Sequence, residues 1–591
     1  MTDIDKFSEL VKLARNRGLF WPSNEIYGGV AGFYDFGPIG VLIKNKIIEE
    51  WRRIFIYEQK GLVVEIETPI ITPRIVLKAS GHEDHFTDPI TECTKCGKLY
   101  RADHLIEETT GIKAEGLSID ELWEIMKKHN IRCPDDGGEL TKPRPALLLF
   151  KTEIGPYKGS PAYIRPETAQ GMFVSFKHVY HCIRERLPIG IAQIGKVARN
   201  EISPRQALIR LREFTIMEIE FFFDPDKAWE ESKEFLTPDV LSEELQILPA
   251  EMKKKGLEKT IKASLRELLD KKLIINPWLG YWMVVGNRFL KKLGIPGEKI
   301  RFEEKLPYER AHYADQTFDQ QVYTEKFGWI EVAGYAYRTN YDLSRHMEFS
   351  KADLTVFKRY EKPLEKKVVK VIPDVKKIRD LVGKDVGKVL RKINELRQEE
   401  ILKALKDKGY ISVEGYRLSR ELFIFKEETV KVHGEKIVPH VVEPSFGLER
   451  IFYTVLENTL YRTSDGKIVL RLPPSIAPYD VAVFPLVAGS KREHKRIREV
   501  AYKLYELLTR AGFLVYYDED GSIGKRYVRA DEMGIPYAIT VDYQSLEDNT
   551  VTIRYRDTRE QIRVHIRDLY DKLTELLGKK IDWTNIIKEA F

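Results

Sequence analysis

The spacing of apolar residues changes along the chain, and each spacing predicts a different secondary-structure element. Residues 38–59, PIGVLIKNKIIEEWRRIFIYEQ, have apolar side chains three or four positions apart, which predicts a long helix. The following segment, LVVEIETPIITP (62–73), predicts a strand. Because proline has no amide hydrogen to donate, Pro69 and Pro73 place this strand at an edge or interface rather than in the middle of a sheet.

The segment RNEISPRQALIRLREFTIMEIEFFF (199–223) predicts a polar strand, a turn and a second strand. From Leu211 onward the odd positions are mostly apolar. Successive side chains of a strand point to opposite faces, so the odd set can be buried while the even set forms a second, working face. That face carries cations, an aromatic ring and carboxylates: Arg210, Arg212, Phe214, Glu218 and Glu220.

Changes in composition predict one antiparallel α+β domain that is interrupted by insertions and followed by a small α/β domain. The main domain is predicted at 1–80, 161–225, 301–350 and 436–474. The insertions are predicted at 81–160, which is polar, at 226–300, which is helical, and at 351–435, which is rich in lysine. Strand-like and helical stretches alternate after residue 475, which predicts a separate α/β domain over 475–591.

Length and composition describe an ordinary globular protein of several structural units, because 591 residues exceed what one core can hold. The N-terminal residues lack a basic segment followed by an apolar run, and no stretch of 18 apolar residues occurs, so we expect neither a signal peptide nor a membrane span. Four cysteines are too few for a disulfide framework, and a cytoplasmic location is expected.

Positive charge is concentrated in one segment. Residues 351–410 hold 18 Lys and Arg against 10 Asp and Glu, whereas the whole chain has a net charge of only +6. Such an excess suits a polyanionic partner. A solvated helical face is the alternative, and it is the commoner explanation of a charged run.

Three segments resemble the signature motifs of the class II aminoacyl-tRNA synthetases. They are the long helix with LVVEIETP, the RNE–loop–REF stretch, and EPSFGLER (443–450), which runs into a helix. Further segments extend the resemblance over nearly the whole chain to the glycyl-tRNA synthetases of the archaeal and eukaryotic dimeric type: ASGHEDHFTDP (79–89), RADHL (101–105), IRPETAQGMF (164–173), ERAHYADQ (309–316) and GWIEVAGYAYRTNYDL (328–343).

The resemblance implies an α+β fold, with the class II antiparallel-sheet catalytic domain, its insertions, and an anticodon-binding domain over 475–591. It implies that glycine and ATP give glycyl-adenylate and pyrophosphate, and that the glycyl group then passes to the 3′ end of tRNA(Gly). It also implies a homodimer, with the first motif at the subunit interface.

The resemblance further implies an ATP site. Charge is spread over phosphate oxygens in this chemistry, so positioning and cationic stabilisation do most of the work, and the amino-acid carboxylate is already a nucleophile. Arg199 and Arg450 resemble the two catalytic arginines, and Phe214 resembles the ring on which adenine stacks. Glu331 is the expected magnesium ligand, with a simple ion-pair partner as the alternative. The remaining expected ATP contacts are Asn200, Glu201, Ile209, Arg210, Leu211, Arg212, Glu213, Val332, Gly447, Leu448 and Glu449.

A glycine site can offer only charge recognition and exclusion, because glycine has no side chain to bind. The family places carboxylates around the ammonium group. The positions that match this set are Glu167, Glu218, Glu443 and Ser445. The resemblance implies further glycine contacts at Arg101, Phe214 and Gly447.

Three cysteines raise the possibility of a zinc site. Cys93 and Cys96 form a CxxC pair, and Cys133 begins a second pair in which Asp136 stands at the fourth position. Zinc accepts an aspartate oxygen, and His129 is another possible ligand. A loop without metal is the equal alternative. Cys182 is expected to be a small buried hydrophobe.

Three segments are expected to contact tRNA: the loop 203–205, the basic stretch 351–410, and the domain 475–591. Single-stranded bases stack on aromatic rings, and Tyr516, Tyr517, Tyr527 and Tyr543 are available in that domain.

Two other functions fit parts of the pattern. One is a sister synthetase that uses proline, threonine or histidine, and the crowded glutamates argue against it. The other is a non-catalytic nucleic-acid-binding relative, which would have no reason to keep Arg199, Glu201, Glu331 and Arg450 together.

Overall fold

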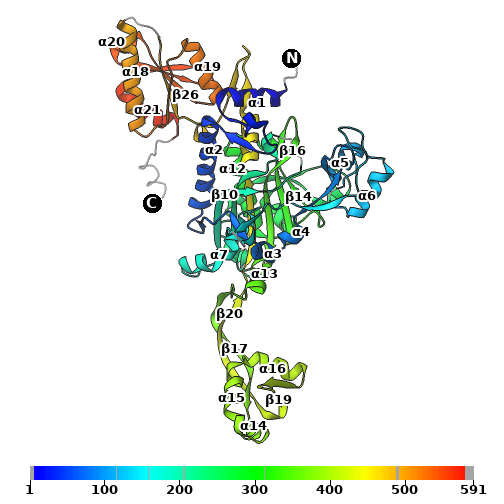
Figure 1. The fold of residues 1–591 in the computed structure, drawn as a ribbon. Helices are drawn as coiled ribbons and strands as arrows, with labels where there is room; N and C mark the ends of the chain where they lie inside the picture. The colour runs from blue at the N-terminus through cyan, green and yellow to red at the C-terminus, as the bar shows by residue number, and fades with distance from the viewer. Residues whose placement is uncertain are drawn as a thin grey trace. The chain divides into compact units, whose positions relative to one another are not determined.

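The computed structural model describes residues 5–114, 116–156, 159–202, 204, 207–311, 313–487 and 492–578. It divides into two compact units, residues 1–354 with 439–591, and Thr355–Val438. Figure 1 traces both units by colour along the chain. None of the described helices is long and apolar enough to cross a membrane.

A large mixed sheet forms the centre of the first unit (Figure 1). Among the described residues, nine strands lie in the order β13-β12-β14-β15-β16-β21-β11-β10-β3. Neighbouring strands are antiparallel, except for the pairs β12–β14 and β10–β3. The predicted α+β class is therefore confirmed. The strands are β3 (Val63–Glu65), β10 (Ile189–Ala198), β11 (Glu213–Phe223), β12 (Glu244–Leu248), β13 (Ile261–Ser264), β14 (Ile300–Glu304), β15 (Gln316–Thr324), β16 (Gly328–Thr339) and β21 (His440–Gly447).

The long helix predicted near the N-terminus is present. It comprises α2 (Pro38–Arg52) and a π-helical turn, η2 (Arg53–Tyr57). Residues 62–73 form two short strands, β3 and β4 (Ile71–Pro73), and each is the terminal strand of its sheet. The edge position predicted from Pro69 and Pro73 is confirmed.

Helices cover both faces of β11. On one face, Phe221 contacts Trp278 and Trp282 of α12 (Pro277–Lys292). On the other, Phe222 contacts Phe173 and Phe176 of α7 (Ala169–Cys182). The prediction of a working face on even positions fails only beyond Glu218, because Glu220 is fully buried and α7 packs against Phe222.

Two local expectations also fail. The stretch 226–300, expected to be a helical insertion, contributes β12 and β13 to the central sheet as well as α12. Cys182 is exposed rather than buried, because it ends α7 where the helix leaves the sheet.

A small subdomain lies between β4 and α7. Its sheet has the order β6-β5-β7, formed by β5 (Thr87–Glu92), β6 (Leu99–Arg101) and β7 (Arg144–Leu147). Helices α5 (Ala102–Thr110) and α6 (Ile119–Lys128) enclose a separate apolar cluster with Leu105, Ile106 and Leu122. This subdomain carries three of the four cysteines.

The C-terminal part of the first unit is an α/β domain. Its sheet has the order β25-β24-β26-β27-β28, with the first three strands parallel. Ala482 and Phe484 of β24 join the core of the central sheet, whereas Val481 and Val483 face a core of their own. The elements are β24 (Val481–Pro485), α18 (Arg492–Arg510), β25 (Val515–Tyr517), α19 (Ile523–Met533), β26 (Tyr537–Val541), α20 (Tyr543–Asp548), β27 (Thr550–Tyr555), β28 (Gln561–His565) and α21 (Leu569–Leu576).

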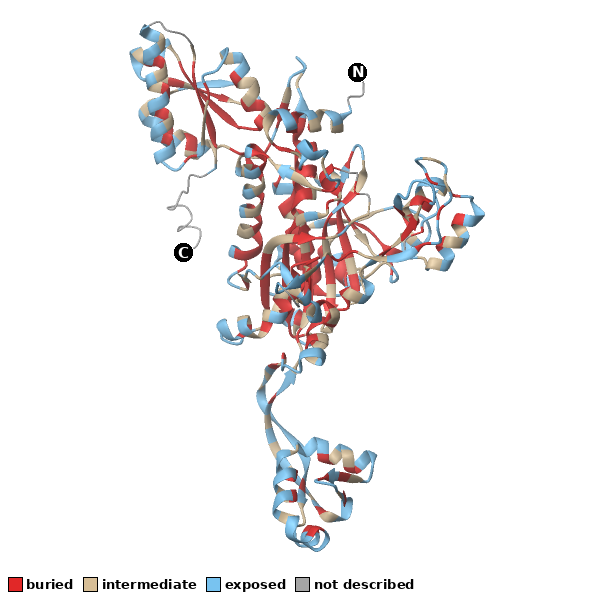
Figure 2. Ribbon diagram, viewed as in Figure 1, coloured by how far each residue is buried: buried red, intermediate tan, exposed pale blue. Residues whose placement is uncertain are grey.

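The second unit, Thr355–Val438, is built on a long antiparallel ribbon of β17 (Val356–Pro373) and β20 (Phe423–Ile437). The ribbon is mostly exposed, as Figure 2 shows. Beyond it, α14 (Val375–Val382), α15 (Val386–Glu395) and α16 (Gln398–Asp407) enclose a small core with β18 (Tyr410–Val413) and β19 (Tyr416–Ser419).

Gly40 of α2 lies against the backbone, and a Cβ there would be 1.8 Å from the Leu19 carbonyl oxygen. We therefore expect Gly40→Ala to lower the free energy of unfolding by about 1–3 kcal/mol, measured by urea denaturation. Gly524→Ala is the matched control, because nothing lies within 4 Å of a Cβ at this helical glycine. Equal stability of the two variants would contradict this packing.

Candidate active site

A cavity of about 240 Å³ opens on the central sheet. Most of its wall comes from three stretches distant in sequence: residues 199–218, residues 331–336 of β16, and the β21–α17 junction, where α17 is Leu448–Thr459. Glu167 and four residues at or before β15, Ala311, Tyr313, Thr317 and Asp319, complete the lining. Most of the predicted site residues line it: Glu167, Arg199, Glu201, Ile209, Arg210, Leu211, Phe214, Glu218, Glu331, Val332, Glu443, Ser445, Gly447, Glu449 and Arg450.

The guanidinium groups of Arg199 and Arg450 line this same cavity. Arg199 lies between the rings of Phe86 and Phe214, with its Cζ 5.4 and 5.3 Å from the two ring centroids. Its Nε donates to the Pro166 carbonyl at 3.1 Å. Arg450 donates from Nε to the Ile209 carbonyl at 2.9 Å and from Nη1 to Glu331 Oε2 at 3.0 Å. Ring contacts and a backbone carbonyl hold Arg199 in place, and a backbone carbonyl and the Glu331 carboxylate hold Arg450. Two cations fixed in this way are suited to bind an anion between them.

Other predicted residues hold the walls or lie outside the lining. Arg212 donates to the carbonyls of Ala31 and Glu201, and Glu213 is paired with Lys196. Asn200 and Leu448 are not among the lining residues. Ser203 and Arg205 of the expected tRNA-contacting loop lie outside the described residues.

Arg101 is engaged within the small subdomain and does not line the cavity. It pairs with Asp103, and its Nη1 lies 3.1 Å from Asp88 Oδ2. Burial raises the pKa of Asp88 to about 6, against the effect of the Arg101 cation. The predicted contact of Arg101 with substrate stays a prediction.

One end of the cavity is lined by buried carboxylates. Glu218 Oε2 accepts from the Thr168 amide at 3.1 Å and from its hydroxyl at 2.6 Å. Glu443 Oε2 accepts from Arg338 Nη1 at 2.9 Å. Glu167 accepts from Gln170 at 3.0 Å and lies 3.2 Å from His82 Nε2. These side chains come from β11, from β21 and from the turn before α7, so the sheet register and that turn bring them together.

Arg338 is a site residue that sequence reasoning missed. It is fully buried, donates to both oxygens of Asp342 at 2.8 and 2.9 Å, and stacks on Tyr313 at 3.7 Å. A useful signal was available, because a cation in an apolar strand followed four positions later by Asp342 is unusual unless the two are paired. Burial and the Glu218 and Glu167 carboxylates raise the pKa of Glu443 well above its ordinary value, although Arg338 opposes this.

Two carboxylates on adjacent strands, Asp319 and Glu331, line another side of the cavity. Glu331 of β16 is 46% exposed, and Asp319 of β15 is buried and lies 2.7 Å from Lys305 Nζ. Burial, together with the Glu331 carboxylate, raises the pKa of Asp319 to about 7. Asp319 was also missed from the sequence. A hard divalent cation beside phosphates fits this pair, because it prefers few carboxylates and several waters.

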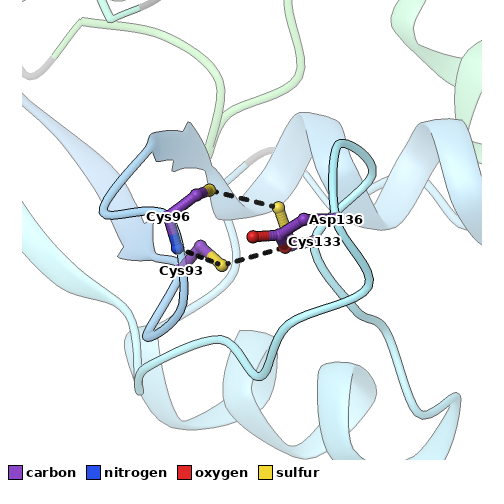
Figure 3. Close-up of side chains that lie close together, drawn as sticks. All are labelled: Cys93, Cys96, Cys133 and Asp136. Carbon is purple, nitrogen blue, oxygen red and sulfur yellow. Dashed lines mark hydrogen bonds between the residues drawn. The ribbon is translucent and has the colours of Figure 1, made fainter.

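The cysteine cluster lies apart from this cavity, in the small subdomain (Figure 3). Cys93, Cys96, Cys133 and Asp136 each offer one atom, and these atoms lie within 4.8 Å of one another. His129 is not part of this group. Cys96 Sγ is 3.8 Å from Cys133 Sγ, and Cys93 Sγ is 3.3 Å from Asp136 Oδ1.

Comparison with known proteins agrees with this fold. The family described as "tRNA synthetase class II core domain (G, H, P, S and T)" matches residues 150–459, and "Anticodon binding domain" matches residues 480–576. Glycine–tRNA ligases of Aeropyrum pernix and Pyrococcus abyssi are 51% and 50% identical to the chain, covering 97% of it and 97% and 99% of their own lengths. That of Methanocaldococcus jannaschii is 43% identical, over 97% of the chain and 99% of its own length.

The central sheet and its cavity are therefore those of a class II tRNA synthetase core. Within that class, the chain belongs to the glycine–tRNA ligase family.

The buried pairing of Arg338 should carry a large share of local stability. We expect Arg338→Met to lower the free energy of unfolding by about 3–5 kcal/mol, because Glu443 and Asp342 lose their buried cation. The control is Lys142→Met, which breaks an exposed pair with Asp120, and about 1 kcal/mol or less is expected there. Thermal and urea unfolding measure the stability of both variants. Similar decreases in the free energy of unfolding for the two variants would contradict the large contribution expected of Arg338.

Proposed function

We propose that this chain ligates glycine to tRNA(Gly) at the expense of ATP. One observation carries the proposal: two arginines from separate segments and three buried glutamates line a single cavity. The cations suit a polyphosphate, and the carboxylates suit a small ammonium group.

In the first step, a glycine carboxylate oxygen bonds to the α-phosphorus of ATP, and the bond to the pyrophosphate oxygen breaks. Arg199 stabilises the charge on the α-phosphate and aligns the carboxylate, and Arg450 holds the γ-phosphate. Adenine stacks on Phe214, and Glu201 accepts from its amino group. Magnesium, when bound, supplies further neutralisation of phosphate charge, and Glu331 with Asp319 would hold it.

In the second step, the 3′-terminal hydroxyl of tRNA attacks the glycyl carbonyl, the ester forms, and AMP leaves. Specificity for glycine arises at the acidic end. Glu167, Glu218 and Glu443 bind the ammonium group, and the enclosing side chains leave no volume for a larger amino acid. Larger amino acids are excluded because their side chains would overlap atoms of the protein. A pocket that only gained binding energy from extra methylenes would separate glycine from them weakly.

Two parts of the chain support tRNA as the partner. The C-terminal domain matches an anticodon-binding family, and among its four candidate tyrosines only Tyr543 is exposed, at 43%, within the described residues. The ribbon of the second unit presents exposed lysines, including Lys366, Lys367 and Lys370. Loss of condensed counterions on binding would make this contact strongly salt-dependent.

A homodimer is proposed on an apolar surface near the first motif. Eight large hydrophobic side chains are exposed in residues 26–75, and exposed apolar patches mark interaction sites. The eight side chains are Ile26, Tyr27, Val30, Val41, Tyr57, Ile70, Ile71 and Ile75.

Exchange of labelled pyrophosphate into ATP tests the function. We expect glycine to support exchange, and proline, threonine and histidine not to. Arg199→Ala should reduce exchange by about 10³-fold without a change in melting temperature, because a fixed cation is lost at the reacting phosphate. Arg266→Ala, which removes an exposed arginine of α11 (Leu265–Asp270), is the control. Exchange that depends on another amino acid would favour a sister enzyme. If no amino acid supports exchange, a non-catalytic relative is favoured.

We also propose that the cysteine cluster binds a structural zinc ion outside the reaction. A tetrahedral site with Zn–S bonds of about 2.3 Å has sulfur–sulfur edges of about 3.8 Å. The 3.8 Å between Cys96 and Cys133 matches this edge. In Figure 3 the four side chains point toward a common centre from two turns.

The two turns are built alike. Gly97 and Gly137 both have left-handed φ values, of 70° and 68°, and each donates to the carbonyl four residues earlier. The amides of Lys95 and Cys96 approach Cys93 Sγ at 3.4 and 3.5 Å, an arrangement that stabilises a thiolate. Asp136 takes the place that a fourth cysteine would occupy. A Cβ at Gly138 would lie 2.7 Å from Cys93 Sγ, so the glycine keeps the site open.

Metal analysis of protein prepared under reducing conditions tests this site. We expect about one zinc per chain in the wild type and far less in Cys133→Ser, which should also unfold its subdomain at lower temperature. Cys182→Ser is the control, because that thiol is exposed and distant in sequence. Less than about 0.1 zinc per chain after incubation with zinc would show a bare loop.

A further inference from the structure

Glu220 is a buried carboxyl group to which neither the mechanism nor the sequence patterns assign a task. It lies on β11 and is 0% exposed. Among the described residues, neither of its oxygens has a hydrogen-bond partner. An ionised carboxylate in such a place would lose its hydration without compensation, which costs several kcal/mol.

The register of the sheet places Glu220 opposite Glu443. Strands β11 and β21 pair Glu218 with Ser445 and Phe221 with Val442, so residues 220 and 443 fall opposite each other. Carboxylate oxygens of Glu218, Glu220 and Glu443 lie within 4.8 Å of one another. Two like charges opposite each other on one face of a sheet are unfavourable, and burial increases this cost.

The neighbouring groups do not supply enough positive charge. Arg338 donates to Glu443, but it also donates twice to Asp342. The bonded oxygen of Glu218 accepts from the neutral Thr168. Burial and the Glu443 carboxylate raise the pKa of Glu220 well above its ordinary value. A shared proton is the simplest way to satisfy the orphaned oxygens and to reduce the repulsion.

We propose that Glu220 is a neutral carboxylic acid that donates its proton to the carboxylate of Glu443 and thereby positions Glu443 for the ammonium group of glycine. Arg338 then donates to one oxygen of the Glu443 carboxylate, and Glu220 donates to that carboxylate from the side away from the cavity. Glu220 does not line the cavity, so it is a positioning residue that acts through Glu443. This inference rests on the proposed function for its effect on glycine, but not for the presence of the proton.

A cation bound by the three glutamates is the competing explanation. It is disfavoured because Glu220 is 0% exposed and does not line the cavity, which leaves no path for a hydrated ion to reach it.

The test compares Glu220→Gln with Glu220→Leu, because glutamine keeps a neutral donor of similar shape and leucine does not. In glycine-dependent pyrophosphate exchange, we expect Leu to raise the KM for glycine about tenfold or more and to leave the KM for ATP unchanged. Gln should restore most of that loss. If Gln behaves like Leu while both variants melt as the wild type does, a neutral donor at residue 220 has no effect on glycine binding and the proposal is overturned.

An infrared measurement separates this inference from the proposed function. The wild type at neutral pH should show the carbonyl stretch of a buried protonated carboxyl, and Glu220→Gln should lack that band. If Glu220→Gln lacks the band but the wild type shows no glycine-dependent exchange, the protonated state of Glu220 is supported and the proposed function is refuted. A spectrum unchanged by Glu220→Gln would refute the proton.

Discussion

The guanidinium group of Arg338, buried among carboxylates, is the interaction on which the candidate site depends. It links β16 to β21 through Glu443 and to the helix that follows β16 through Asp342. Without a buried cation, the carboxylates at this end would repel one another at low dielectric constant. The cluster still has more acids than bases, so it is poised to accept one more positive charge. A bound ammonium group supplies that charge, which connects the stability of the site with its selectivity.

The other end of the cavity works on the opposite principle. Arg199 and Arg450 are held by aromatic rings and backbone carbonyls, and only Arg450 is partly neutralised by a carboxylate, Glu331. Their charge therefore remains available for phosphate oxygens. One cavity thus has a cationic end and an anionic end, and a small zwitterion that reacts with a polyphosphate fits both. The sheet provides the rigidity that such preorganised electrostatics require.

The peripheral parts obtain their stability in different ways. The C-terminal domain shares a core with the catalytic sheet through Ala482 and Phe484. The unit Thr355–Val438 has its own small core around Ile378 and Val389. The small subdomain between β4 and α7 has a modest apolar cluster beside its cysteines. A small core is a reason for an additional crosslink such as a metal ion, because little apolar surface can be buried there.

The sequence by itself determined the features that depend on neighbours along the chain. Apolar spacing showed the helix at 38–59, prolines showed the edge position of residues 62–73, and the paired CxxC-like turns showed the cysteine cluster. The motif residues Arg199, Glu443 and Arg450 were also found in this way, because their segments are distinctive. Each of these signals is local, so it survives without knowledge of the fold.

Only the tertiary structure decided which side chains share a buried environment. Glu220 looked like a member of a working face, but α7 covers that face and the register sets Glu220 opposite Glu443. Asp319 was overlooked because its partner Lys305 comes from another segment. Arg338 was overlooked although Asp342 lies only four positions away, and its second partner, Glu443, comes from another strand. Arg101 matched a motif, yet carboxylates of its own subdomain engage it. The physical reason is common to all four residues: charge and burial depend on strand pairing and helix packing between distant segments, and the periodicity of a single segment does not encode them.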